Sequence, residues 1–315
     1  MIGVILSKVA TVFILMGLGF FLNKRGILPG EMDKALSRLL MSVTSPCLII
    51  STMASKEIGE GLWGNVLTAM GLSAAYFAVF MVIAEIVCRR ILKIPPEKDC
   101  GVYMMLFVSI NNGFMGFPIT LAIFGEDVLF YMVFFQVTQL LYLYGPGTVR
   151  LHYGDGEEFS KTRALKTILG PNTIAAVIGL VIMALSLRLP DFIMEPIDII
   201  GDSTTMLSML VIGMELGMSD FRAIARNRHL IRMSAIKMIL CPVLTLLLVN
   251  WLPVITEIKI ILIFGSAFPS AVAVAAIAAN ENKNSVLSAE GVAITTLMSL
   301  ATIPITAAVI TLLYL

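Results

Sequence analysis

The chain has 315 residues, of which 58% are hydrophobic and 14% are charged, and its formal net charge is +1 at pH 7. Soluble domains carry roughly 25% charged residues, so this composition excludes a soluble enzyme and predicts an all-α integral membrane protein. A net charge near zero also provides no field that would attract nucleic acid.

Ten apolar windows divide into two sets of five around a polar interval. The first set lies near residues 2–22, 35–54, 62–88, 101–124 and 127–149. The second set lies near residues 168–187, 197–217, 230–251, 259–279 and 286–314. A membrane-spanning helix needs about 20 apolar residues, so the windows predict ten transmembrane helices, the first of them a helix and not a removable signal. We expect one domain over 1–315, with repeat 1 at about 1–149, a cytoplasmic loop at about 150–167 and repeat 2 at about 168–315.

The basic residues gather in alternate loops. Most of the 22 Lys and Arg residues lie after windows 1, 3, 5, 7 and 9, at residues 24–38, 89–98, 150–166 and 222–232 and at Lys283. Loops rich in Lys and Arg stay on the cytoplasmic side of a membrane. This distribution predicts that these loops are cytoplasmic and that both termini lie outside.

Five windows in each half predict an inverted repeat. With an odd number of spans in the first half, the second half enters the membrane from the opposite side, as in many secondary transporters. At a constant offset Ser45 of window 2 falls on Ser208 of window 7, and windows 4 and 9 each contain a Phe-Pro step. The sequence therefore predicts a 5+5 inverted repeat.

Window 4 contains a polar stretch in the middle of an apolar span. The adjacent carboxamides of Asn111 and Asn112 are costly in hydrocarbon unless they find partners. Gly113 and Gly116 weaken the helix there, and Pro118 removes a backbone donor. Unwound backbone at membrane depth is tolerated inside protein or beside a water-filled cavity. We therefore expect a broken helix, with Pro118 as the first residue of its second half and free amides at Ile119 and Thr120.

Window 9 repeats this pattern around Pro269 and Ser270. In an inverted repeat, two broken helices cross and direct two positively polarised helix ends at one cavity. Such a site suits an anion, most plausibly a carboxylate. The alternative is a pair of proline kinks whose asparagines bond to neighbouring backbone. The predicted substrate-binding residues are Asn111, Asn112, Gly113, Gly116, Phe117, Pro118, Ile119, Pro269, Ser270 and Ser45.

Three ionisable residues in the apolar windows are candidates for ion coupling: Asp202, Glu215 and Lys237. Ionisable side chains within a membrane are costly and often functional. Neither broken segment contains an acid, which argues against an exchanger that binds its ion on a midplane aspartate. We expect no cofactor and no metal centre, and the sequence leaves open whether transport is uncoupled or coupled to H⁺ or Na⁺.

The run from Asn111 to Pro118 resembles the signature Asn-x-Gly-Phe-Leu-Gly-Leu-Pro of the auxin efflux carrier family of membrane transporters. The resemblance covers essentially the whole chain. It extends to segments Ser45–Ile49 and Phe268–Ala271, to the Asn280–Asn284 turn, and to Thr295, Thr296 and Pro304.

This resemblance implies a 5+5 repeat with crossed helices 4 and 9, similar to that of bile-acid sodium symporters. It also implies transport of organic anions, such as auxin in plants and malate or malonate in bacterial relatives, and it suggests a homodimer. The short loop at 150–166 is typical of bacterial members, which implies a bacterial cytoplasmic membrane. Asn112 stands where the family often has Thr, and Met115 and Phe117 replace Leu. Because of these differences, the substrate preference of family members cannot be assigned to this chain.

Together these patterns predict a secondary-active or facilitative carrier of a small organic anion, embedded in the lipid bilayer and working by alternating access. An anion channel or a ligand sensor on a transporter scaffold is the alternative. An intramembrane hydrolase is more remote, because the sequence has no H-E-x-x-H or G-x-S-x-G motif and its histidines, His152 and His229, fall in predicted loops. The sequence also lacks the phosphate-binding loop of an ATP-driven pump.

Overall fold

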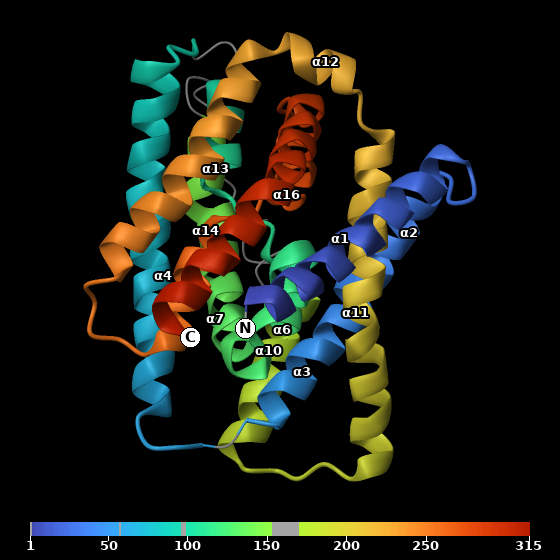
Figure 1. Cartoon of the computed structure of the whole chain (residues 1–315), viewed down its shortest axis with the longest axis vertical. Helices are drawn as coiled ribbons and strands as arrows, with labels where there is room; N and C mark the ends of the chain where they lie inside the picture. Colours follow the sequence, from blue (N-terminus) through green and yellow to red (C-terminus); the bar gives the residue numbers. More distant parts are fainter. Residues whose placement is uncertain (1, 57, 96–98, 153–169) are drawn as a thin grey trace.

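The computed structural model describes residues 2–56, 58–95, 99–152 and 170–315, and these residues form helices without any strand (Figure 1). The all-α prediction is therefore confirmed for the described part of the chain. Residues 153–169, which include most of the cytoplasmic loop predicted at about 150–167, lie outside the described residues.

Several helices contain a π-helical turn, written η, where the helix widens by one residue. The first half comprises α1 (Ile2–Lys24), α2 (Glu31–Leu39), η1 (Leu40–Thr44), α3 (Ser45–Ala54), α4 (Leu62–Glu85), η2 (Ile86–Ile91), α5 (Cys100–Val108), η3 (Asn112–Gly116), α6 (Phe117–Phe124), α7 (Glu126–Tyr142), η4 (Leu143–Gly147) and α8 (Thr148–Leu151). The second half comprises α10 (Pro171–Ala184), α11 (Asp191–Met218), α12 (Phe221–Arg226), α13 (Arg228–Val249), α14 (Thr256–Ser266), α15 (Ala273–Asn280) and α16 (Ser285–Tyr314).

Within the described residues, eight helical stretches are long and apolar enough to cross a bilayer. This supports an integral, multi-pass membrane protein. The remaining two predicted windows hold the 14-residue helix α10 and the interrupted pair α14–α15. The number of ten spans and their division into two inverted halves therefore remain predictions.

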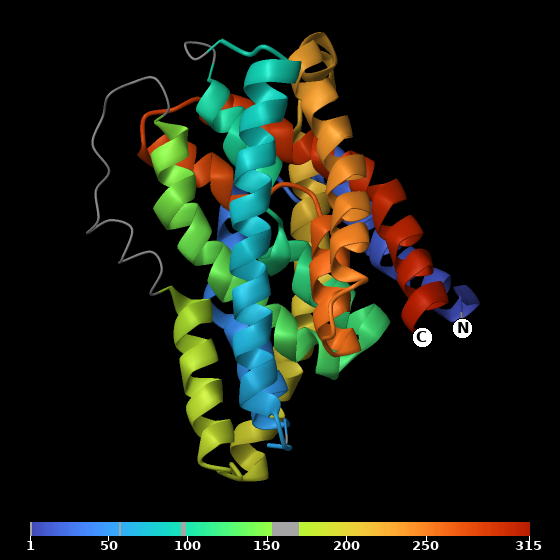
Figure 2. The same ribbon diagram turned by 90° about the vertical axis from the view of Figure 1, so that its left-hand side faces the viewer.

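The helices pack in two groups. The first group contains α1, α2, α3, α10 and α11, and the second contains α4 to α8 and α13 to α16 (Figure 1). The two chain ends lie close together, where α1 and α16 make contact (Figures 1 and 2). Every residue of α5 is buried, so the interrupted helix α5–α6 begins in the interior of the second group.

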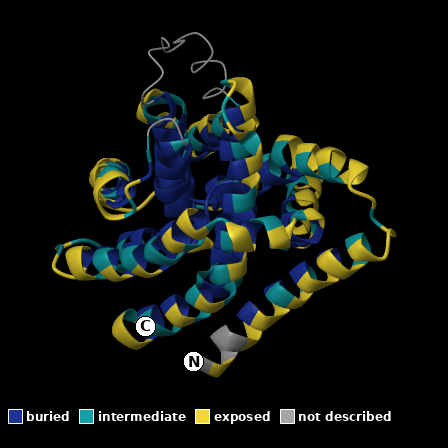
Figure 3. Ribbon diagram, turned by 90° about the horizontal axis from the view of Figure 1, so that it is seen from above, coloured by how far each residue is buried: buried dark blue, intermediate teal, exposed yellow. Residues whose placement is uncertain are grey.

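Apolar side chains occupy both the interior and the outer surface. Buried residues gather toward the middle of the molecule, while the peripheral helices are exposed on their outer faces (Figure 3). Several of these exposed side chains are large and apolar, and Leu67, Ile239 and Leu312 are 71%, 66% and 71% exposed. Such a surface suits contact with lipid tails.

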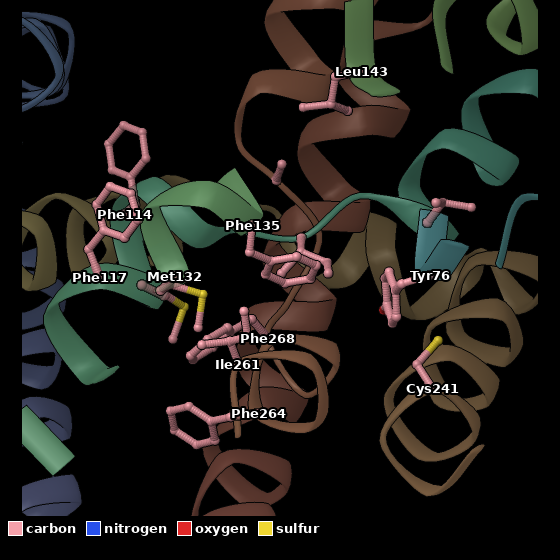
Figure 4. Packing of buried hydrophobic residues seen from close by; sticks show 14 of the residues in the cluster. Tyr76, Phe114, Phe117, Met132, Phe135, Leu143, Cys241, Ile261, Phe264 and Phe268 are labelled. Atoms are coloured by element: carbon pink, nitrogen blue, oxygen red, sulfur yellow. The ribbon is translucent and has the colours of Figure 1, made fainter. Parts of the chain in front are cut away.

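Aromatic rings fix the place where α14 is interrupted. Phe135 of α7 packs on Phe77 with ring centroids 5.4 Å apart, and Phe264 packs on Phe268 at 4.8 Å (Figure 4). Gly265 lies so close to Phe135 that an added Cβ would approach its ring to 2.4 Å. This packing joins α4, α7 and α14 and holds the chain just before Pro269.

The first group is held together by a close glycine contact between α1 and α11. A Cβ at Gly213 would lie 2.1 Å from the Met16 carbonyl oxygen, and one at Gly19 would lie 2.3 Å from that of Leu210. Small residues at helix interfaces let backbones approach closely in membranes. Both contacts are with backbone atoms, so the helices would have to separate to admit a side chain.

Gly213→Ala is therefore expected to lower the melting temperature of the detergent-purified protein, because overpacking costs about 1–3 kcal/mol. Gly17→Ala is the matched control, since a Cβ at Gly17 meets nothing within 4 Å. The control should be as stable as the parent or more stable, because alanine favours a helix over glycine. Equal melting temperatures for the two variants would contradict the close contact.

Candidate functional site

Helices α5–α6 and α14–α15 are both interrupted, at the two places where the sequence predicts it. Ser109 has extended backbone (φ −65°, ψ 149°) after the end of α5, and helical backbone resumes at Asn112. The second interruption follows Ser266, and α15 begins at Ala273. Each interruption leaves the carboxyl end of one helix and the amino end of another in the protein interior.

The second halves of the two interrupted helices do not begin at Pro118 and Pro269, so that prediction is wrong. Pro118 lies in the first turn of α6, but the π turn η3 already supplies helical backbone before it, and this wider turn admits the proline ring. Pro269 lies in the unwound segment. The Ser270 amide donates to Thr295 Oγ1 (3.0 Å) and the Ala271 amide to Ser109 Oγ (3.3 Å), so helical hydrogen bonding does not resume directly after the proline.

The two interruptions contact each other directly. The Asn111 amide donates to the Pro269 carbonyl oxygen at 2.8 Å. The Ser270 hydroxyl donates to the Leu106 carbonyl oxygen at 2.6 Å. Backbone groups that the helices leave unpaired at each break are thus partly satisfied by the other break.

Lys237 of α13 joins both interruptions. Its side chain is 1% exposed, and Nζ donates to the carbonyl oxygens of Leu106 (2.9 Å) and Ser109 (2.6 Å) and to Ser270 Oγ (2.9 Å). These acceptors satisfy the three donors of an ammonium group. Two of them lie at the carboxyl end of α5, where the helix dipole favours a cation.

A cavity of about 200 Å³ lies beside the interruptions, between the two helix groups. We call it the amide cavity, because four of its lining residues carry carboxamides and none of its lining residues is charged. It is lined by Met41, Ile110, Asn111, Gly113, Phe114, Gln136, Gln139, Leu140, Leu143, Tyr144, Gly170, Pro171, Asn172, Thr173, Ala271, Val272 and Ala273.

The amino-terminal ends of three helices reach this cavity: the η3–α6 run at Gly113, α15 at Ala273, and α10 at Asn172. Such ends carry partial positive charge and unpaired amides, so they attract anions. These helix ends therefore favour an anion in the cavity, although no cationic side chain lines it.

Several buried polar atoms in the cavity wall have no hydrogen-bond partner among the described residues. They are Asn111 Nδ2, Gln136 Oε1, Asn172 Nδ2 and Oδ1, and Thr173 Oγ1. Buried polar groups are usually paired, because leaving them unpaired costs free energy. The arrangement can bind a small molecule that has both an anionic end and hydrogen-bonding groups.

The two adjacent asparagines have different surroundings. Asn111 lines the amide cavity with a free Nδ2, whereas Asn112 Nδ2 donates to Gln139 Oε1 at 3.0 Å. Gln139 Nε2 in turn donates to the Ile110 carbonyl oxygen, and a Cβ at Gly116 would lie 2.8 Å from Asn112 Oδ1. Asn112 and Gln139 therefore shape the interruption, while Asn111 Nδ2 has no partner among the described residues.

The structure places the other predicted site residues away from this cavity. Phe117, Pro118, Ile119 and Ser45 are buried and line neither this cavity nor the larger one described next. The Ser45 hydroxyl has no partner among the described residues. No contact in the structure tests a binding role for these four residues, so those roles remain predictions.

A second cavity, of about 360 Å³, opens on the other side of Val272 between α11, α15 and α16. Four carboxylates line it, Asp33, Glu215, Asp220 and Glu290. The predicted coupling residue Glu215 thus lies among acids, and Lys237 lies at the interruptions. Asp202 is exposed on α11 and lines neither cavity.

Sequence reasoning did not single out Gln136, Gln139, Asn172 or Thr173. The two glutamines do leave a signal, since they are spaced one helical turn apart in an otherwise apolar window. Buried carboxamides at that spacing share one helix face and need partners. Asn172 follows a Gly-Pro step at the edge of a polar interval, where it resembles an ordinary loop residue.

Comparison with known proteins agrees with a transport role. A sequence model of the family described as "Membrane transport protein" matches residues 4–307. The chain is 25% identical to an uncharacterized transporter of Methanocaldococcus jannaschii over 222 residues, which are 67% of this chain and 68% of that one. It is 27% identical to an uncharacterized transporter of Methanothermobacter thermautotrophicus over 154 residues, 48% of this chain and 49% of that one. The chain belongs to the membrane transport protein family that includes the auxin efflux carriers.

Proposed function

We propose that the protein is a secondary-active or facilitative carrier of small organic anions, and that the amide cavity binds the substrate carboxylate. One observation carries this proposal: three helix amino-termini and Asn111, whose Nδ2 has no partner among the described residues, line one cavity that has no acidic lining residue. Half-helix amino-termini bind anionic substrate groups in other secondary transporters.

The position of the cavity supports alternating access. Met41 and Asn172 line it from the first helix group, and Asn111, Gln136 and Val272 line it from the second. A bound substrate would therefore contact both groups, and rocking of one group against the other would change the side from which the cavity opens. The two contacting interruptions also support a 5+5 inverted repeat, which we include in the proposal.

Asn111→Ala is expected to weaken carboxylate binding about 5- to 150-fold, because it removes one hydrogen-bond donor from the cavity. The fold should survive, since Asn111 Nδ2 has no partner among the described residues. Thermal shift of purified protein with a series of carboxylates measures both effects. Thr204→Val is the matched control, because Thr204 Oγ1 is also buried and unpartnered but lies outside both cavities.

If Asn111→Ala binds carboxylates as the parent does, the amide cavity is not the binding site. If the parent binds no carboxylate, the proposed substrate class fails.

We also propose a cytoplasmic-membrane location with both termini outside. The basic loops and the proximity of the two chain ends support this orientation (Figure 1). A single cysteine added at the C-terminus should react with an impermeant maleimide applied from outside, while one at Gly156, outside the described residues, should not. The reverse labelling pattern would contradict the orientation.

A further inference from the structure

We propose that Asn172, in the first turn of α10, forms a second polar subsite of the amide cavity that binds a hydroxyl group of the substrate. The protein would then prefer hydroxycarboxylates to carboxylates with an unsubstituted chain. This inference rests on the proposed function in one respect, because it needs a carboxylate in the same cavity.

Asn172 is buried without a partner. It is 6% exposed, and neither Nδ2 nor Oδ1 has a hydrogen-bond partner among the described residues. Whichever way the carboxamide of Asn172 is turned, its NH₂ group lacks an acceptor and its oxygen lacks a donor. An unpaired buried carboxamide destabilises the ligand-free protein. Asn172 lines the amide cavity, and a ligand there that pairs with its carboxamide would remove this free-energy cost.

The subsite has the hydrogen-bonding pattern of a hydroxyl partner. Asn172 Oδ1 and Gln136 Oε1 are unpaired acceptors, and an ionised carboxylate has no proton to give them. Asn172 Nδ2 and the Thr173 hydroxyl can donate, as can the first-turn amides of α10, whose first intrahelical bond is made by the Ile174 amide to Gly170 at 3.0 Å. A hydroxyl both donates and accepts, so a single hydroxyl can satisfy both kinds of group.

The polar residues that line the cavity come from both helix groups. Asn111 and the η3 amino-terminus come from the second group, and Asn172 and Thr173 come from the first. The apolar side chains of Met41, Phe114, Leu140 and Leu143 also line the cavity and suit a short carbon chain. A hydroxycarboxylate would thus bridge the two groups, with its carboxylate on one and its hydroxyl on the other.

The test compares butyrate, its 2-, 3- and 4-hydroxy derivatives and succinate as ligands of the purified full-length protein. Isothermal titration should give at least one hydroxybutyrate that binds the parent more tightly than butyrate by about fivefold or more. Asn172→Ala should lower the affinity for that hydroxybutyrate more than the affinity for butyrate, so that the preference is lost. Asn172→Ser, which keeps a donor and an acceptor, should retain part of it.

The melting temperature of the variant reports its folding independently of ligand binding. Asn172→Ala removes two unpaired buried atoms, so its melting temperature should equal or exceed that of the parent. Thr204→Val removes an unpaired buried hydroxyl outside the cavity and should leave every ligand preference unchanged.

The outcomes separate this inference from the proposed function. If the parent binds butyrate and its hydroxy derivatives equally, or if Asn172→Ala keeps the preference, the subsite does not exist although the carboxylate site stands. If succinate gains affinity through Asn172 and the hydroxybutyrates do not, the subsite binds a second carboxylate, and the hydroxyl proposal is wrong. If the parent binds none of these acids, the proposed function and this inference fail together.

Discussion

Lys237→Ala is expected to stop anion transport and to lower the melting temperature in sodium-free buffer. The lysine is fully enclosed, and its ammonium joins α13 to both helix interruptions through Leu106, Ser109 and Ser270. Removing the ammonium leaves the buried Ser109 carbonyl without this donor, and a buried unpaired group costs about 1–3 kcal/mol. Lys34→Ala, on the exposed surface of α2, is the matched control and should behave like the parent.

Sodium gives this variant a specific signature. Unwound carbonyls and the carboxyl ends of half-helices coordinate Na⁺ in several secondary transporters. Here the Leu106 and Ser109 carbonyls and the Ser270 hydroxyl accept from Lys237 instead, so these residues do not fit a sodium ion while the lysine is present. Replacing choline chloride with sodium chloride should therefore raise the melting temperature of Lys237→Ala and leave that of the parent unchanged.

Two results would contradict this role of Lys237. Transport by Lys237→Ala at the parental rate would mean that the ammonium does not hold the interruptions in place. If sodium raised the melting temperature of the parent as much as that of the variant, a sodium ion would bind without displacing the lysine.

Pro269→Ala is expected to abolish carboxylate binding while the melting temperature stays unchanged or rises. Alanine restores a backbone donor and favours helix over proline by about 3 kcal/mol at an interior position. Helix α14 can then continue past Ser266, which would remove the 2.8 Å contact between the Asn111 amide and the Pro269 carbonyl and distort the adjoining cavity. Thermal shift with and without ligand measures stability and binding together.

Pro118→Ala is the matched control for this change. Pro118 lies within the continuous helical run that begins at Asn112, and it does not line the amide cavity. Its replacement should stabilise α6 and leave ligand binding intact. If both proline variants bind like the parent, the second interruption is not needed for the site. Loss of fold in Pro269→Ala alone would mean that the proline serves packing.

The helical architecture and the interruptions follow from local patterns that the sequence displays. Apolar windows long enough to span a bilayer recur along the chain, and the Asn-Asn-Gly run places carboxamides and glycine where a continuous helix would be costly. Both interruptions occur where these patterns predict them. The starts of the second half-helices were missed, because side-chain contacts from Thr295 and Ser109, distant in the sequence, decide where α15 begins.

The composition of the site depends on packing that no local pattern encodes. Lys237 lies close in sequence to an arginine cluster that the sequence predicts to be cytoplasmic, which favours an extended side chain that reaches the membrane surface. The structure instead turns it to the interruptions, since α13 packs against α5. Asn172 likewise becomes a cavity residue because the start of α10 lines the same cavity as residues of the second helix group, and the rotation of one helix against another is set only by their contacts.

Uptake of radiolabelled carboxylates into proteoliposomes containing the purified protein tests the central claim most directly. We predict uptake that saturates with substrate concentration, that other small carboxylates inhibit, and that Asn111→Ala reduces far more than Thr204→Val. Conductance that does not saturate would identify a channel, and carboxylate binding without any flux would identify a sensor. Either result would contradict an alternating-access carrier.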